Sequence, residues 1–99
     1  MANAFASQIR AGDVLRMGDI GDALEMFAHF EITGQIIASV SHVQVLMVNE
    51  DPVNEHILWV TVSVRRDIMP TTFELSKDER VTIMRLMTVD EAANPPWRD

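Results

Sequence analysis

The stretch HILWVTVSVRR, residues 56–66, is the clearest β-strand signal in the chain and decides its fold class. Aliphatic residues occupy every second position, namely Leu58, Val60, Val62 and Val64. Since successive side chains of a strand point to opposite faces, this period predicts one buried face and one partly exposed face. β-Branched residues dominate the stretch and neither glycine nor proline interrupts it, which favours a strand over a helix.

Shorter stretches with a two-residue period lie on both sides of this strand. They are residues 23–33, residues 35–49 with a change of phase near residues 41–42, residues 71–75 and residues 80–87. A helix is the alternative for residues 23–33, because Asp22 and Glu25 have the spacing of a capping box. We favour the strand there, since on a helix Glu31 would fall on the apolar stripe. The charged residues 76–79 predict a single helical turn before the last strand.

Three Gly-Asp pairs crowd into GDVLRMGDIGD, residues 12–22. A Walker phosphate loop needs Lys followed by Ser or Thr after its last glycine, whereas Asp22 follows Gly21 here. The glycines also lack the G-x-G-x-x-G spacing of a dinucleotide loop, and the acids lack the order of a calcium loop. We therefore interpret each pair as a turn, in which glycine supplies a positive φ and aspartate accepts backbone N–H groups.

Length and composition indicate one folded domain. The chain has 99 residues, of which 47% are hydrophobic and 23% charged, as in ordinary globular proteins. We expect a flexible N-terminus over residues 1–7, a β-barrel domain over residues 8–87 and a tail over residues 88–99. The absence of cysteine excludes disulfides and thiolate chemistry, and no apolar run is long enough to span a membrane. These features predict a cytoplasmic protein.

The order of these segments resembles that of small SH3-like β-barrel proteins of actinobacteria and their phages. The resemblance lies in IRAGDVL (residues 9–15), the long central strand, and FELSKDERVTIMRL (residues 73–86). It implies an all-β fold, a small SH3-like barrel of five or six strands with one short helical turn before the last strand. It also implies an accessory protein that a phage encodes or that is related to phage proteins. The chain departs from the pattern by a longer insert over residues 17–34.

The charge balance disfavours nucleic acid as a partner. Fifteen Asp and Glu residues against eight Lys and Arg residues give a net charge of −7, which repels phosphate backbones. A basic aromatic face around Trp59 is nevertheless the basis of an alternative function, a nucleic-acid-binding small barrel. Its candidate cations are Arg65, Arg66, Arg80 and Arg85.

Catalytic and metal-binding patterns are weak. The three histidines, His29, His42 and His56, have no local ligand spacing such as H-x-H. Ser41 and His42 are neighbours that would point to opposite faces of a strand, and no G-x-S-x-G motif is present. We therefore predict a protein that is not an enzyme, with no catalytic residue, no cofactor and no metal.

Four apolar residues are candidates for binding a partner. Phe27, Ile57 and Trp59 fall opposite the main apolar stripes, and Trp97 follows Pro95-Pro96 in the tail. Exposed aromatic side chains are typical anchors of protein interfaces, although the same residues could instead complete the core. We expect a non-catalytic protein–protein interaction or self-assembly module, whose partner is another protein or a second copy of this chain.

Overall fold

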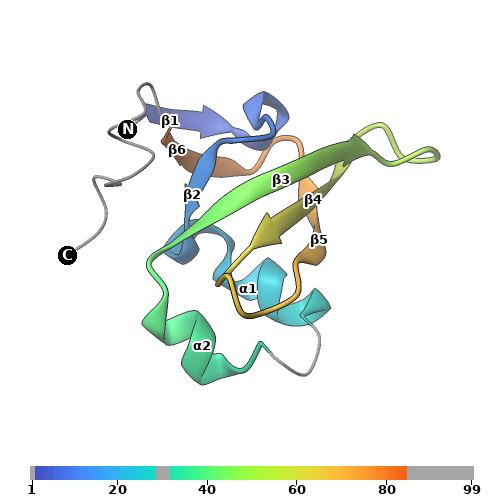
Figure 1. Cartoon of the computed structure of the whole chain (residues 1–99). Coiled ribbons are helices and arrows are strands. Elements are labelled where there is room, and N and C mark those ends of the chain that lie inside the picture. Colours follow the sequence, from blue (N-terminus) through green and yellow to red (C-terminus); the bar gives the residue numbers. More distant parts are fainter. Residues whose placement is uncertain (1, 29–31, 85–99) are drawn as a thin grey trace.

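A computed structural model describes residues 2–28 and 32–84 of the chain. Residues 1, 29–31 and 85–99 lie outside this description. The described part contains six strands, two α-helices and one 3₁₀ helix (Figure 1). In chain order they are β1 (Ala2–Phe5), the 3₁₀ helix η1 (Ala6–Gln8), β2 (Val14–Arg16), α1 (Met17–Phe27), α2 (Gly34–Ser39), β3 (His42–Glu50), β4 (Ile57–Ser63), β5 (Thr71–Ser76) and β6 (Arg80–Met84). Neither α-helix of the described part is long and apolar enough to cross a membrane.

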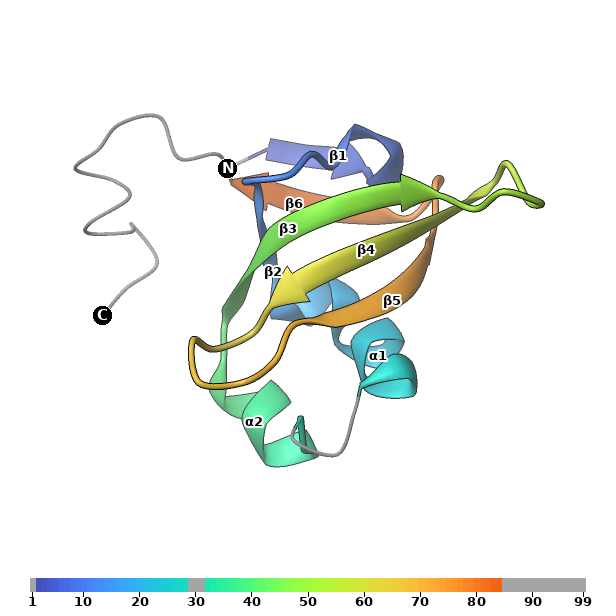
Figure 2. The ribbon, with the colours of Figure 1, turned by 45° about the vertical axis from the view of Figure 1, so that its right-hand side comes forward.

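The six strands form one antiparallel sheet with the order β1-β6-β2-β3-β4-β5. The sheet bends strongly, so that β1 and β6 lie at one side and β5 at the other (Figures 1 and 2). β1 and β5 are its edges and do not pair with each other, so the sheet is not closed. The mainly β fold that the sequence predicts is therefore confirmed, and the sheet is an open one.

The central strand β4 has the two faces that its sequence predicts. Val60 pairs in register with Phe73 of β5, and Leu58 pairs with Leu75, which places all four side chains in the core. Val62 faces the same side and pairs with Val45 of β3. Cross-strand pairs on one face contact each other directly, so these aliphatic and aromatic pairs hold β3, β4 and β5 together.

The first helix corrects the strand that we predicted over residues 23–33. Residues 17–27 form α1, and Met17, Ile20 and Leu24 are buried along one side of it. Their spacings of three and four residues match the period of a helix. Gly18 and Gly21 disguise this period, because glycine is a poor helix former and a common turn residue.

The second helix also replaces a predicted strand. α2 covers residues 34–39, and the Thr33 hydroxyl accepts a hydrogen bond from the Ile36 N–H at 3.3 Å, as an N-terminal helix cap does. The strand β3 begins only at His42, close to the change of phase in the sequence. Its register shifts between Val45 and Met47, where a β-bulge lies.

Helix α1 fills the open side of the sheet. It lies beside the edge strand β5 in both views, and Ile20 and Leu24 enter the core with 1% and 0% exposure (Figures 1 and 2). At the point where β2 ends, Asp19 Oδ2 accepts a hydrogen bond of 2.8 Å from the Thr82 N–H of β6. Helix α1 therefore completes this part of the core with its buried side chains and is bonded to β6 through one carboxylate.

The connections correct two smaller predictions. Gly12 has a φ of +93° and the Asp13 side chain accepts the Arg10 N–H at 2.9 Å. The turn interpretation is therefore right for Gly12-Asp13, and it is wrong for the two Gly-Asp pairs that lie in α1.

Residues 76–79 form a tight turn closed by a hydrogen bond from the Glu79 N–H to the Ser76 carbonyl, not a turn of helix. Only three residues separate β5 from β6, which leaves no room for a longer helical turn.

The N-terminal segment joins the sheet. Residues 1–7 were expected to lie outside the barrel domain, whereas Ala2–Phe5 pair with β6 as the edge strand β1. The Ala6 and Ser7 N–H groups then donate to the carbonyls of Glu79 and Lys77. These backbone hydrogen bonds attach η1 to the β5–β6 turn.

Two alanine variants distinguish the helix from the predicted strand. Leu24→Ala should lower the free energy of unfolding by about 2–5 kcal/mol, because it leaves a cavity at a fully buried site. Met26→Ala should change it by less than about 0.5 kcal/mol, because the Met26 side chain is 80% exposed on α1. Urea unfolding measures both. Similar losses in the two variants would favour a strand, in which both side chains share the inner face.

Two glycine variants test the two backbone environments of the Gly-Asp pairs. Gly12→Ala should destabilise the protein by about 1–2 kcal/mol, because an L-residue resists the positive φ. Gly21→Ala should stabilise it by about 0.4–1 kcal/mol, since its Cβ would lie at an ordinary 3.8 Å from Ile37 Cγ2 and alanine favours the helix. Thermal unfolding of both variants checks the opposite signs, and equal signs would contradict them.

Candidate functional site

An aromatic pair lies on the outer side of the sheet. Phe27, the last residue of α1, packs against Trp59 of β4 with ring centroids 5.5 Å apart and ring planes at 88°. This edge-to-face geometry is a favoured arrangement for two aromatic rings. Phe27 is 38% exposed and Trp59 is partly exposed, so the pair is accessible from outside.

Asp51 fixes the orientation of the indole. The Trp59 Nε1–H donates to Asp51 Oδ2 at 2.8 Å, while Asp51 Oδ1 accepts the N–H groups of Val53 and Asn54 at 2.9 and 2.8 Å. These donors hold the pKa of Asp51 below its usual value, with the Asn54 N–H as the largest cause, followed by the indole and the Val53 N–H. One carboxylate thus orders both the β3–β4 turn and the aromatic side chain.

Strand register places further residues around the pair. Met47 of β3 lies on the same outer face and is 49% exposed, and Ile57 shares this face of β4 and is partly buried. Polar Asn49 and Glu74 are the cross-strand neighbours of Trp59. We call Phe27, Met47, Ile57 and Trp59 the outer patch. It combines aromatic and aliphatic side chains with polar neighbours, as small interfaces do.

The structure thus brings together three of the four residues that the sequence proposed for partner binding, Phe27, Ile57 and Trp59. The fourth, Trp97, lies outside the described residues. Sequence reasoning missed Met47, because the bulge between Val45 and Met47 changes which residues face outward.

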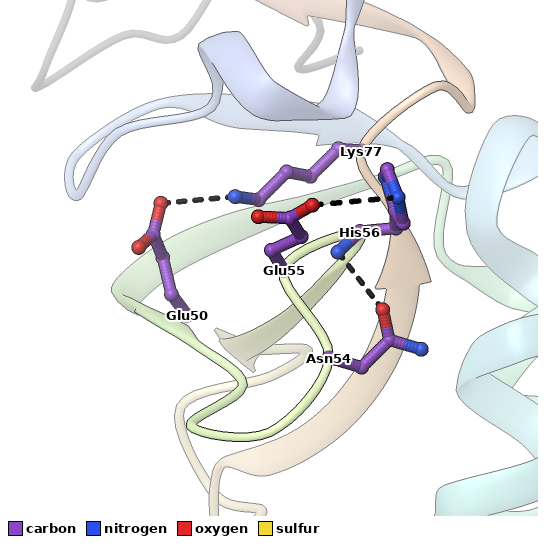
Figure 3. Close-up of polar contacts among 5 residues, drawn as sticks. All are labelled: Glu50, Asn54, Glu55, His56 and Lys77. Carbon is purple, nitrogen blue, oxygen red and sulfur yellow. Dashed lines mark hydrogen bonds and ion pairs between the residues drawn. The ribbon is translucent and has the colours of Figure 1, made fainter.

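Polar contacts tie the hairpin end beside the outer patch to the β5–β6 turn (Figure 3). Lys77 Nζ pairs with Glu50 Oε1 at 3.0 Å, and the Lys77 N–H donates to the His56 carbonyl at 2.9 Å. The Asn54 side chain accepts the His56 N–H at 3.0 Å, and His56 Nε2 lies 3.9 Å from Glu55 Oε1. These contacts restrain the loop that carries Asp51.

The two described histidines, His42 and His56, lie far apart along the β3–β4 hairpin. His42 is the first residue of β3 and His56 immediately precedes β4, so they occupy opposite ends of this antiparallel pair. His29 lies outside the described residues. Ser41 and His42 do not point apart as we expected, because Ser41 precedes the strand, and its Oγ lies 2.9 Å from His42 Nδ1.

The arginines of the nucleic-acid alternative occupy different places. Arg65 and Arg66 follow β4, and the Arg65 guanidinium binds both oxygens of Asp67 at 3.0 and 2.6 Å. Arg80 begins β6, at the other end of β5, and its guanidinium lies 4.9 Å from the centre of the Phe5 ring. Arg85 lies outside the described residues. The described arginines therefore do not form one basic face with Trp59.

Comparisons with known proteins give no relative from which a function could be transferred. No family model, no curated protein and no solved structure matches the chain. The outer patch is therefore judged on its geometry and chemistry alone.

The hydrogen bond between the Trp59 indole and Asp51 should be detectable by following Trp59 fluorescence during an acid titration. Because the pKa of folded Asp51 is lowered, the bonds that it accepts persist above this pKa and are lost as pH falls through it. In a Trp97→Phe background, we expect Trp59 fluorescence to change with a midpoint below 3.8. Asp51→Asn should abolish this transition. A midpoint at or above 3.8, with the far-UV circular dichroism unchanged, would contradict the arrangement.

Proposed function

We propose that this chain is a non-catalytic protein–protein interaction or self-assembly module, and that the outer patch is its contact surface. The partly exposed edge-to-face pair of Phe27 and Trp59 is the observation that supports this most directly. Aromatic side chains dominate the energetics of protein interfaces, since they bury much apolar area with few rotatable bonds.

The fixed orientation of the Trp59 side chain also supports this proposal. Trp59 is held by Asp51 and by Phe27, so little side-chain entropy is lost when a partner covers it. Two carboxylates lie beside Trp59. Asp51 follows β3 and Glu74 lies in β5, which are the two strands that flank β4. A partner segment with an apolar anchor beside a positive charge would complement this surface.

The occupant that we propose is the tail of a second copy of this chain. Residues 88–99 contain Pro95-Pro96-Trp97-Arg98, which puts an aromatic anchor next to a cation and behind two conformationally restricted residues. Trp97 is thirteen residues beyond Met84, the last residue of β6, which permits a reach of about 43 Å when extended. The longest extent of the molecule is 39 Å, so the tail is long enough to reach a neighbouring copy.

We propose an SH3-like barrel whose open side is covered by α1, in a cytoplasmic accessory protein related to small proteins of actinobacteria and their phages. Consecutive antiparallel pairing of β2, β3, β4 and β5 and the tight β5–β6 turn support this assignment. The long insert over residues 17–34, which departs from the pattern of those proteins, corresponds largely to α1.

Light scattering over a range of concentrations tests this function. The full chain should form a concentration-dependent oligomer, and removal of residues 88–99 should make it monomeric. Phe27→Ala should weaken self-association by about 10-fold or more, as loss of an interface anchor does. Trp59→Ala should do the same, with its fold checked by circular dichroism.

Phe5→Ala is the matched control, because Phe5 is also an exposed aromatic residue, at 44%, on the opposite edge of the sheet. Its oligomeric mass should equal that of the unmodified chain. A full chain that stays monomeric at all concentrations would overturn self-assembly. An oligomer that neither the truncation nor Phe27→Ala affects would overturn the assignment of the outer patch.

A further inference from the structure

An open cavity of about 540 Å³ lies between α1, α2 and the start of β3. The outer patch does not include any of its lining residues. Its walls differ in character: β2 and the start of β3 provide polar side chains, and α2 provides apolar ones. Helix α1 provides two glycines together with Met17 and Asp22. Such a combination of a few polar groups with apolar walls is typical of small-ligand sites.

The polar wall brings donors from two strands together. Arg16, the last residue of β2, pairs in register with His42, the first residue of β3. The hydroxyl of Ser41 lies 2.9 Å from His42 Nδ1, so the hydroxyl, the imidazole and the guanidinium line one side of the cavity. Arg16 is exposed and, within the described ranges, forms no ion pair or side-chain hydrogen bond.

The helical wall leaves main-chain atoms open to the cavity. Gly18 and Gly21 both line it, and a Cβ atom added at Gly18 would meet nothing within 4 Å. They lie in the first two turns of α1, whose N-terminal peptide dipoles favour a negative charge nearby. The helix end thus favours an anion, as the Arg16 guanidinium does, whereas the Asp22 carboxylate of the same helix opposes it.

The third wall is apolar. Ile37, Ala38 and Val40, from α2 and the residue after it, line the cavity opposite the strands that carry Arg16 and His42. They can contact a hydrocarbon group but cannot hydrogen-bond to it through their side chains. The cavity therefore suits a molecule with an anionic end and a short apolar body.

We infer that this cavity binds a small oxyanion, a carboxylate- or phosphate-bearing molecule, whose anionic group contacts Arg16 and Ser41. A planar guanidinium can donate two parallel hydrogen bonds to either anion. The Ser41 hydroxyl adds a third donor when the His42 Nδ1–H donates to its oxygen. The body of the ligand then lies against Ile37 and Val40. This inference does not depend on the outer patch or on self-association.

Asp22 and His42 set the conditions for binding. Asp22 also lines the cavity, so its carboxylate weakens the binding of a simple anion. Burial, and then the charge of Arg16, lower the pKa of His42 below 6.5. A bound anion favours the charged imidazole, so binding takes up a proton and affinity rises as pH falls. Arg16 of β2 and Asp22 of α1 are the other charged residues of the lining, and α2 contributes none.

Titration of the ¹⁵N-labelled full chain with inorganic phosphate, acetate and butyrate tests the inference. Saturable amide shifts should centre on residues 16–22 and 41–42. If the ligand is a carboxylate, butyrate should bind more tightly than acetate by about two- to fourfold for each methylene that the apolar wall covers. Tighter binding of phosphate than of either carboxylate would identify a phosphate-bearing ligand.

Substitutions of the lining residues distinguish binding in this cavity from non-specific binding of anions to the protein surface. Arg16→Gln should weaken binding by about 10-fold or more, and Asp22→Asn should strengthen it by about two- to threefold. Gly21→Ala places a methyl group 3.8 Å from Ile37 Cγ2, between two lining residues of the cavity, and should weaken binding while the helix is retained. Arg65→Gln, at an exposed arginine outside the cavity, is the matched control and should have no effect.

Two results would overturn the inference. One is the absence of saturable shifts for all three anions up to about 50 mM, which is well above the millimolar range of weak specific binding. The other is equal binding by the Arg16→Gln, Arg65→Gln and unmodified chains, provided that the amide spectra show that all three are folded.

Discussion

The packing of α1 against the open side of the sheet is the contact on which the rest of the molecule depends. Helix α1 covers the core beside the edge strand β5, where its Ile20 and Leu24 side chains are buried. The hydrogen bond from the Thr82 N–H to Asp19 fixes the helix to β6 near the point where β2 ends. In a chain of 99 residues, where a small core leaves a narrow stability margin, one buried helix face is a large share of the total.

Both candidate sites follow from this packing. The C-terminal end of α1 places Phe27 against Trp59, which is 32 positions later in the chain. Its N-terminal half exposes Gly18 and Gly21 to the cavity beside Arg16. In each case a rigid helix end and a sheet position side chains that are distant in sequence. Such pre-ordering favours binding because less conformational entropy is lost when a ligand or partner arrives.

The sequence was informative where one face of a strand is buried. The alternation in residues 56–66 predicted β4 and its inner residues Leu58, Val60 and Val62, and the shorter patterns predicted β5 and β6. Burial of one face imposes a strict two-residue period, which survives whatever the other face contains. The same argument put Trp59 and Ile57 on the outer face, where the structure has them.

The sequence was misleading where two local signals conflict. Leu24, Met26 and Ala28 alternate as in a strand, while Ile20 and Leu24 have helical spacing, and tertiary packing decides for the helix. α2 is only six residues long, which is too short for a clear period. The Phe27–Trp59 contact and the Arg16–His42 pairing depend on long-range register, which single-sequence patterns do not contain.

Solution NMR of the labelled full chain tests the central role of α1 most directly. The account predicts helical Cα shifts over residues 17–27, together with a nuclear Overhauser effect between the rings of Phe27 and Trp59. Extended-type shifts over residues 23–28, without contact between these rings, would contradict it. In that case the core would be completed by a strand, and neither the outer patch nor the cavity beside Arg16 would exist in the form described.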